Sequence, residues 1–494
     1  MFRIESSQYN PGPPGQPADV MDFIDRLNRL EELNPEIRGF FSADSDLIVT
    51  RSPGRLDVMG GIADYSGSLV LQLPTFESTL VALQRDRSRE IKILSLGAGP
   101  QGQLLRFELP IGDLQAGGEP IDYDRARHYF ASDPSNHWAS YVAGAFIVLM
   151  RERSVKFSEG ARILIASNLP QGKGVSSSAA IEVATMQAIA SSFGLKIDPP
   201  DLALLCQIIE NAVVGAPCGI MDQMTAVCGE PGKLLALLCQ PAKLQGTIPI
   251  PDGLAVWGLD SGIAHSVSGS EYSSVRVGAF MGYRIIASHA GLAVDIAPCP
   301  GLVVVDDPRW GGYLANIDPS EFETRYAGAL PAALSGSEFI SRYQGTTDSV
   351  ARVDPGRTYL VRTATAHPVY EHSRVREFAE LLGGTLDGAR MEMLGELMYQ
   401  SNESYSACGL GSAGTDLLID LIKRAGPQRG LYGARVTGGG SGGTVALLGC
   451  PSAEGAVRDI AHRYGEITGR KPYIFRGSSP GASQFGYLRM RANR

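Results

Sequence analysis

Two kinds of hydrophobic pattern run along the first part of the chain. Short apolar runs at 46–53, 68–74 and 79–86 are rich in leucine and valine, which predicts three strands. Residues 20–34 instead space their apolar side chains by three and four positions, which predicts a helix. A stretch rich in proline and glycine precedes this helix, and we expect residues 1–42 to form an N-terminal arm that rests on the main body.

Stronger patterns begin near residue 135, after a tract of weak periodicity. Residues 135–150 are mostly apolar and predict a buried helix. The run 161–170 predicts a strand, and 176–195 predicts a helix that ends at Gly194, as glycine often ends helices. Further elements are predicted at 201–214, a helix, and at 233–239 and 254–262, both strands.

Helical patterns dominate the second half of the chain. They are predicted at 274–291, 373–384 and 414–426. Residues 433–450 contain two alternating runs around a glycine-rich turn, which predicts a strand-turn-strand unit. Residues 296–360 are rich in proline, glycine and aspartate and have the character of an insertion. We therefore predict an α+β protein with one domain at 43–255 and a second at 256–494.

Length and charge narrow the function classes. A chain of 494 residues is long for one core, which supports two domains. A net charge of -8 argues against a nucleic-acid surface. The seven cysteines form no C-x-x-C pair, which predicts reduced thiols, and no apolar run approaches the roughly 18 residues that span a bilayer. The first residues lack the features of a signal peptide, so we expect a cytoplasmic protein. We also expect that it binds neither nucleic acid nor membranes and that it is either a monomer or a weak dimer.

The segment 170–180, PQGKGVSSSAA, joins a predicted strand to a predicted helix. Gly172 and Gly174 allow close approach of the backbone to a ligand, and the serines that follow add hydroxyls where a helix N-terminus already favours an anion. A triphosphate fits such a segment. The P-loop motif is excluded, because it requires serine or threonine directly after its lysine, and here Gly174 follows Lys173.

Candidate acid–base and metal-binding groups lie in three further places. Asp222, between apolar neighbours in APCGIMDQ, can orient or deprotonate an attacking hydroxyl if a cation such as Arg55 keeps it ionised. Glu210 can share Mg²⁺ with a serine hydroxyl, since both offer the oxygen ligands that this ion prefers. Each acid taken alone also fits a solvated surface charge. Among seven histidines only His367 and His372 lie close together, which is weak evidence for another metal.

Three motifs together resemble a known family. Residues 51–67, 170–180 and 433–443 are similar, in this order, to the signature motifs of the GHMP kinases. WASYVAG at 138–144, APCGIMDQ at 216–223 and HSVSGSEYSSVR at 265–276 are similar to the galactokinase branch of that family. The resemblance implies a two-domain kinase whose active site, with sugar, ATP and Mg²⁺, lies in the cleft between the domains.

The resemblance also implies a role for each matching residue. Asp222 would be the catalytic carboxylate with Arg55 as its partner, and Ser178 and Glu210 would hold Mg²⁺. The remaining positions would bind substrates: Gly172, Gly174, Ser176, Ser177 and Ser178 the phosphates; Gly61, Ile62, Asp64, Gly219 and Tyr272 the sugar; Gly438, Gly439 and Gly440 the floor of the cleft. Trp138 and Tyr141 are interpreted as helix packing rather than as an adenine platform.

One departure from the galactokinase motif changes the expected substrate. Galactokinases carry G-E-H-T-D-Y-N-G where this chain has GGIADYSG at 60–67, in what we interpret as a substrate-binding loop at 52–67. The missing Glu and His bind the sugar 6-hydroxyl in that family, and Gly61 and Ile62 replace them. L-Arabinopyranose is D-galactopyranose without the hydroxymethyl group, so an apolar Ile62 avoids leaving buried polar groups unpaired, at about 1 to 3 kcal/mol each.

The resulting prediction is an ATP-dependent sugar 1-kinase that makes L-arabinose 1-phosphate. Several stretches, among them 51–74 and 214–242, are similar to the L-arabinokinases within this branch. A galactokinase with a relaxed pocket is the alternative within the same reaction class. A sensor that binds sugar and ATP without turnover is a third reading, against which the intact Arg55, Asp222, Ser178 and Glu210 argue.

Overall fold

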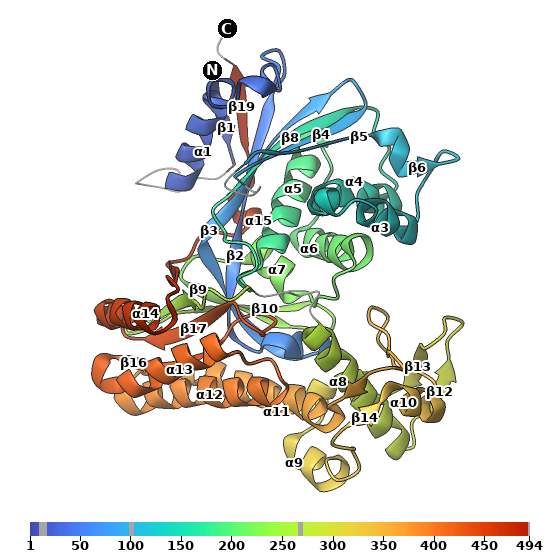
Figure 1. Cartoon of the computed structure of the whole chain (residues 1–494), viewed down its shortest axis with the longest axis vertical. Coiled ribbons are helices and arrows are strands. Elements are labelled where there is room, and N and C mark those ends of the chain that lie inside the picture. Colours follow the sequence, from blue (N-terminus) through green and yellow to red (C-terminus); the bar gives the residue numbers. More distant parts are fainter. Residues whose placement is uncertain (9–16, 98–102, 265–269, 493–494) are drawn as a thin grey trace.

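The computed structural model describes residues 1–8, 17–97, 103–264 and 270–492 (Figure 1). Its larger sheet has nine strands, with the order β1-β19-β2-β3-β8-β4-β5, and with β9 and β10 beside the other part of β3. The bounds of these strands are β1 Phe2–Ser7, β2 Leu47–Met59, β3 Leu69–Asp86, β4 Glu90–Leu96, β5 Leu105–Pro110, β8 Gly160–Ser167, β9 Lys233–Leu238, β10 Lys243–Pro249 and β19 Leu488–Ala492.

The strand β3 corrects one prediction from the sequence. The runs 68–74 and 79–86 belong to a single strand of 18 residues rather than to two strands. Residues 69–72 pair with β9 and residues 79–86 pair with β8. Pro74 has no N–H to donate. It lies between these two segments, where the neighbouring strand on this side of β3 changes from β9 to β8, so the missing donor is tolerated.

The stretch 52–67, which we interpreted as a loop, also has regular structure. The strand β2 continues to Met59 and is buried along its whole length. After Gly60, with φ 110°, the chain forms a short 3₁₀ helix, η2 Gly61–Ser66. The prediction of a loop was wrong because the strand continues through Pro53 and Gly54, two residue types that favour turns when the sequence is read locally.

Helices pack on both faces of the larger sheet (Figure 1). One face carries a large apolar core beneath α3 Tyr123–Ala131, α4 Ser140–Arg153, α5 Ser177–Phe193, α6 Pro199–Ile208 and α7 Met221–Cys228. The N-terminal helices α1 Ala18–Asn28 and α2 Leu30–Leu33 contribute to a second, smaller core with strands of the same sheet. The predicted helices at 135–150 and 176–195 are confirmed as α4 and α5, and α5 ends at Gly194 in the left-handed conformation. The weakly periodic tract before residue 135 contains β4, β5 and α3.

A second sheet lies below the first and is covered by long helices (Figure 1). Its four antiparallel strands follow the order β16-β17-β11-β18, where β16 is Leu431–Val436, β17 Thr444–Gly449, β11 Ala255–Asp260 and β18 Ile474–Arg476. The strand-turn-strand unit predicted at 433–450 is therefore confirmed. The helices are α8 Ser270–His289, α11 Val361–Leu382, α12 Gly388–Ala407, α13 Ala413–Ala425 and α14 Glu454–Thr468.

Short elements fill the segment between α8 and α11. They are β12 Ala293–Ile296, β13 Val303–Asp306, η7 Leu314–Asn316, α9 Pro319–Glu321, η8 Phe322–Tyr326, β14 Leu334–Ser335, α10 Gly336–Tyr343 and β15 Thr358–Tyr359. The small remaining elements are β6 Gln115–Ala116, β7 Glu119–Pro120 and α15 Ala482–Phe485, with 3₁₀ turns η1 Pro35–Ile37, η4 Ile111–Leu114, η5 Pro134–Ala139, η9 Pro427–Arg429 and η10 Pro451–Ala453 and the π-helical turn η6 Ile209–Val214.

Two further observations bear on predictions from composition. All seven cysteines lie in the described part of the chain and are free thiols, as expected. Within the same residues, no helix combines the length and the apolar character that crossing a bilayer requires.

Candidate active site

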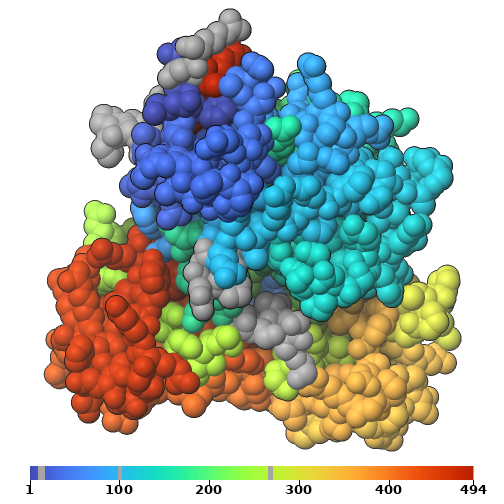
Figure 2. Space-filling model, turned by 45° about the horizontal axis from the view of Figure 1, so that its top comes forward, coloured from blue at the N-terminus to red at the C-terminus, as the bar shows by residue number. Residues whose placement is uncertain are grey.

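A cavity of about 550 Å³ brings most of the predicted site residues together. Its lining comes from strands of the larger sheet, from helices and the segments beside them, and from the turn between β16 and β17 of the second sheet. Figure 2 shows the face where the N-terminal part of the molecule, blue to cyan, meets the C-terminal part, orange to red. The lining includes Arg55, Ile62, Asp64, Gly172, Gly174, Ser176, Ser177, Ser178, Glu210, Gly219, Asp222, Tyr272 and Gly439.

The segment between β8 and α5 forms one end of the cavity. Gly172 and Gly174 have φ values of +67° and +68°, a conformation that glycine adopts without strain. Ser176 adopts φ +59° directly before α5, and its buried hydroxyl has no hydrogen-bond partner in the described part of the protein. No described side chain caps α5, so its first backbone N–H groups are free to bind an anion.

Arg55 and Asp222 meet as predicted, although 167 positions separate them in the sequence. The Nε of Arg55 lies 2.9 Å from Oδ1 of Asp222, and one of its terminal nitrogens lies 2.8 Å from the same oxygen. The other terminal nitrogen donates to the carbonyl of Gly174 at 2.6 Å. The arginine, which is 3% exposed, therefore links the carboxylate to the glycine segment before α5.

Buried carboxylates lie beside this pair. Glu210, in the π-helical turn η6, is within hydrogen-bonding reach of Ser178, as predicted. The Nε2 of Gln223 donates to Glu210 at 2.6 Å and to Glu182 at 3.1 Å. Burial, and then the negative charge of Asp222, raises the pKa of Glu210 to about 7. Burial also raises the pKa of Glu182, whose Oε1 accepts no hydrogen bond from any described residue.

Sequence reasoning did not identify Glu182 or Gln223 as site residues. A signal was present, because Glu182 lies four positions after Ser178 on a predicted helix, which places the two on the same helical face. Gln223 directly follows Asp222. Its role depends on η6 packing against α7, a contact that local periodicity does not reveal.

The opposite wall carries the residues predicted for the sugar. Asp64 is buried in η2, and its Oδ2 has no hydrogen-bond partner within the residues that the structure describes. Burial, and then Asp222, raises its pKa to about 7, opposed by Arg276. A Cβ at Gly219 would lie 1.6 Å from Oδ2 of Asp64, so glycine is required there. Ile62 and Tyr272 also line this wall, while residues 265–269 of the motif 265–276 lie outside the described residues.

Gly61 occupies a different environment from the one we expected. It is absent from the described cavity lining, whereas its neighbour Ile62 is present. A Cβ at Gly61 would lie 2.5 Å from the hydroxyl of Tyr405, 2.7 Å from Nη2 of Arg435 and 2.9 Å from Oδ2 of Asp57. Gly61 therefore faces a buried polar network behind the cavity wall.

The glycine turn after β16 closes the cavity from the side of the second sheet. Gly439 lines the cavity. A Cβ at Gly438 would lie 2.7 Å from the carbonyl of Gly174 and 3.2 Å from Arg55, so this glycine packs directly on the anion-binding segment. Gly440 instead packs against Leu410. The turn thus contacts the cavity floor, with one of the three predicted glycines in its lining.

Aromatic residues also line the cavity. Trp138 and Tyr141 lie there with Ser95, Leu105 and Ile181. Both aromatic side chains also pack against the core beneath α4. The interpretation as helix packing therefore describes only part of their surroundings.

Comparisons with known proteins identify relatives of the chain and its fold. Residues 140–230 match the model of the GHMP kinases N terminal domain. The chain is 45% identical over 494 residues to an L-arabinokinase of Arabidopsis thaliana, a match that covers 92% of this chain and 48% of that protein. The chain thus spans about half the length of this relative. It is 29% identical over 426 residues to a galactokinase of Chloroflexus aggregans, covering 85% of this chain and 89% of the other.

A solved structure agrees over nearly the whole chain. The galactokinase of Lactococcus lactis, complexed with galactose, superposes with a TM-score of 0.68 at 20% sequence identity. The superposition covers 92% of this chain and 98% of that one, which establishes a common fold. The predicted α+β class and the resemblance to GHMP kinases are confirmed. The chain has the GHMP kinase fold, with the GHMP kinases N terminal domain at residues 140–230 and homology to L-arabinokinase along most of its length.

Proposed function

We propose that this chain is an ATP-dependent sugar 1-kinase that converts L-arabinose to L-arabinose 1-phosphate. The observation that carries the proposal is the pairing of Ile62 and Asp64 on one wall of the cavity. Asp64 offers a free carboxylate oxygen to sugar hydroxyls, and Ile62 presents an apolar side chain beside it. This combination suits a pyranose that lacks a hydroxymethyl group, and the likeness to L-arabinokinase supports the same substrate.

The Arg55–Asp222 pair supplies the groups for phosphoryl transfer. Asp222 is positioned to orient the anomeric hydroxyl and to accept its proton, while Arg55 stabilises the ionised carboxylate at 2.8 Å. Because Arg55 also donates to the carbonyl of Gly174, it fixes the position of the Asp222 carboxylate relative to the segment that would bind the phosphates. Phosphoryl transfer depends mainly on such positioning and on charge stabilisation.

The residues near α5 fit ATP and Mg²⁺. The phosphates would bind at the uncapped start of α5, with Gly172, Gly174, Ser176 and Ser177 around them. The hydroxyl of Ser178 and the carboxylate of Glu210 offer oxygen ligands that suit Mg²⁺. The buried Oε1 of Glu182, which has no hydrogen-bond partner among the described residues, is a further place where a cation would be favourable. When bound, Mg²⁺ would offset the negative charge of the phosphates.

The aromatic end of the cavity suits the nucleobase. Trp138 and Tyr141 both line the cavity, Trp138 from η5 and Tyr141 from α4. Flat aromatic side chains at a cavity end favour stacking with an adenine ring. This assignment leaves the wall with Asp64 and Ile62 to the sugar.

The decisive measurement is kcat/KM for L-arabinose against D-galactose with ATP and Mg²⁺. We expect a preference for L-arabinose of about a hundredfold, because D-galactose would bury its 6-hydroxyl against Ile62 without a partner. Asp222→Asn is the matched control, and it should retain sugar binding while losing nearly all turnover. Equal efficiency on both sugars would contradict the assigned substrate, and full activity of Asp222→Asn would contradict the assigned chemistry.

A further inference from the structure

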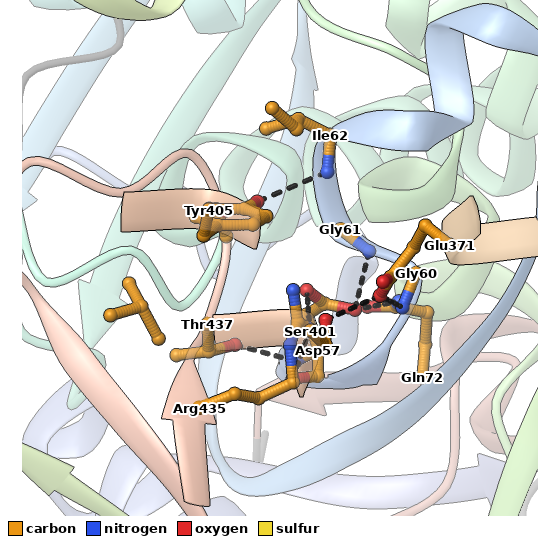
Figure 3. A network of polar contacts seen from close by, with 12 residues as sticks. Asp57, Gly60, Gly61, Ile62, Gln72, Glu371, Ser401, Tyr405, Arg435 and Thr437 are labelled. Atoms are coloured by element: carbon orange, nitrogen blue, oxygen red, sulfur yellow. Dashed lines mark hydrogen bonds and ion pairs between the residues drawn. The ribbon is translucent and has the colours of Figure 1, made fainter. Parts of the chain in front are cut away.

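The backbone just before Ile62 is held by a buried polar network (Figure 3). Three consecutive N–H groups, those of Gly60, Gly61 and Ile62, each donate to a buried side chain. The acceptors are Glu371 at 3.1 Å, Asp57 at 3.0 Å and the hydroxyl of Tyr405 at 3.0 Å. Since Glu371 lies on α11 and Tyr405 on α12, two helices that cover the second sheet hold the backbone at the start of this cavity wall.

Charges and further hydrogen bonds fix these acceptors in place. Asp57 pairs with Arg435 and accepts from Gln72 at 2.6 Å. Glu371 accepts from Ser401 at 2.5 Å. Burial opposes its ionisation, but Arg374 and Arg435 keep the pKa of Glu371 below its usual value. Glu371 therefore remains an acceptor for the backbone at neutral pH.

The hydroxyl of Tyr405 joins two segments that reach the cavity. It accepts from the N–H of Ile62 and donates to the carbonyl of Gly438, in the glycine turn that packs on Arg55. The guanidinium of Arg435 lies 5.1 Å from the centre of the Tyr405 ring, which restricts the ring on one side. The hydroxyl oxygen of Tyr405 thus fixes the position of Ile62 relative to the glycine turn.

None of these network side chains is part of the described cavity lining, so they act on a ligand only through the backbone. We propose that Tyr405 is a positioning residue that sets Ile62 against the sugar and thereby contributes to the choice between a pentose and a hexose. This inference rests on the proposed function, and it adds a determinant of specificity outside the cavity.

Tyr405→Phe tests the proposal, because it removes one oxygen and keeps the ring. It leaves the N–H of Ile62 and the carbonyl of Gly438 buried without their partner, so we expect Ile62 to move. The KM for L-arabinose should rise about tenfold, with the KM for ATP changed less than about twofold. The ratio of kcat/KM for L-arabinose over D-galactose should fall by a similar factor, which loss of stability alone would not produce.

Tyr283→Phe is the matched control. Tyr283 is 1% exposed, and its hydroxyl donates to Asp307 at 2.7 Å, away from the cavity. It should lower the melting temperature without changing the sugar ratio. If Tyr405→Phe fails to fold, Glu371→Gln serves instead, because a neutral amide oxygen accepts from the N–H of Gly60 more weakly than a carboxylate does and the charge pair with Arg374 is lost. It should shift the sugar KM in the same direction.

The outcomes separate this inference from the proposed function. Wild-type protein that phosphorylates neither sugar would contradict the function. A second outcome is that the wild-type protein is active, but folded Tyr405→Phe or Glu371→Gln keeps the wild-type KM for L-arabinose and the wild-type ratio of kcat/KM for the two sugars. This outcome would overturn the role of the network while leaving the function intact. A raised KM with an altered ratio in Tyr405→Phe and not in Tyr283→Phe supports the inference.

Discussion

Asp64 shows how one buried residue can make substrate binding depend on pH. Its carboxyl group has a pKa of about 7, raised first by burial and then by Asp222. A raised pKa means that the folded protein favours the neutral form. The stability that this proton contributes is therefore fully present below the ordinary carboxyl pKa of 3.8 and is lost as the pH rises through about 7. The ionised form, which accepts hydrogen bonds more strongly, prevails only above that pH.

We therefore expect sugar affinity to fall as the pH decreases below about 7. A neutral carboxyl accepts weaker hydrogen bonds from sugar hydroxyls than a carboxylate does. Calorimetric titration of the sugar without nucleotide, between about pH 5.5 and 8.5, measures this directly and keeps nucleotide binding, which the titration of Glu210 would also affect, out of the measurement. Asp64→Asn should bind more weakly at pH 8 and show little pH dependence. An unchanged pH slope in that variant would assign the effect to another group.

At the scale of elements, the anion-binding segment between β8 and α5 is tied to the second sheet. The Nζ of Lys173 lies 2.9 Å from Oδ2 of Asp260 at the end of β11. The carbonyl of Lys173 accepts from the hydroxyl of Thr444 on β17 at 2.9 Å. The segment that would bind phosphate is therefore held by both sheets, and its lysine is partly neutralised before any nucleotide arrives.

Lys173→Met should weaken nucleotide binding without affecting the sugar. The substitution keeps the aliphatic stem but removes the ion pair with Asp260, so the segment is held by its backbone alone. We expect the KM for ATP to rise about three- to tenfold, in line with a partly buried pair, and the sugar affinity to stay constant. Lys233→Met is a suitable control, since its ion pair with Glu230 is exposed. Equal effects of both variants would argue against a specific role for Lys173.

Local sequence patterns predicted the elements that carry their own signals. The β8–α5 unit has an apolar strand, glycines and a helix that ends at Gly194, and the motifs predicted that Arg55 and Asp222 would meet. The unbroken β3 and the network around Gly61 were not predicted. The bond from Ile62 to Tyr405 connects positions 343 apart, and no hydrophobic period along the chain carries that information. The substitution at Gly61 was visible, but its surroundings required the fold.

At the scale of the whole molecule, Arg51 connects distant parts of the chain. It is fully buried in β2 and lies 2.8 Å from Asp19 at the start of α1. It also donates to Ser479 and to the carbonyl of Phe76, each at 2.8 Å. One guanidinium thus holds α1, the larger sheet and a C-terminal segment together.

Arg51→Met should lower the free energy of unfolding by about 3 to 5 kcal/mol, because Asp19 would keep a nearly buried charge without its partner. Chemical denaturation measures the loss. The double variant Arg51→Met with Asp19→Asn should recover part of it, since the unpaired charge is then gone. Arg29→Met, which removes a surface pair with Asp25, should change stability by less than about 1 kcal/mol. A loss no larger than that control would show that the connection contributes little.

The place of β19 has a consequence for synthesis. In the larger sheet this strand, Leu488–Ala492, lies between β1 and β2, which are made at the opposite end of the chain. At about 5 to 20 residues per second, the ribosome needs on the order of a minute to reach β19 after releasing β2. Throughout that interval the edge of β2 at Leu47–Val49 has no strand beside it. The nascent chain therefore offers an open edge to other chains, and a chaperone or fast collapse must protect it until β19 has been made.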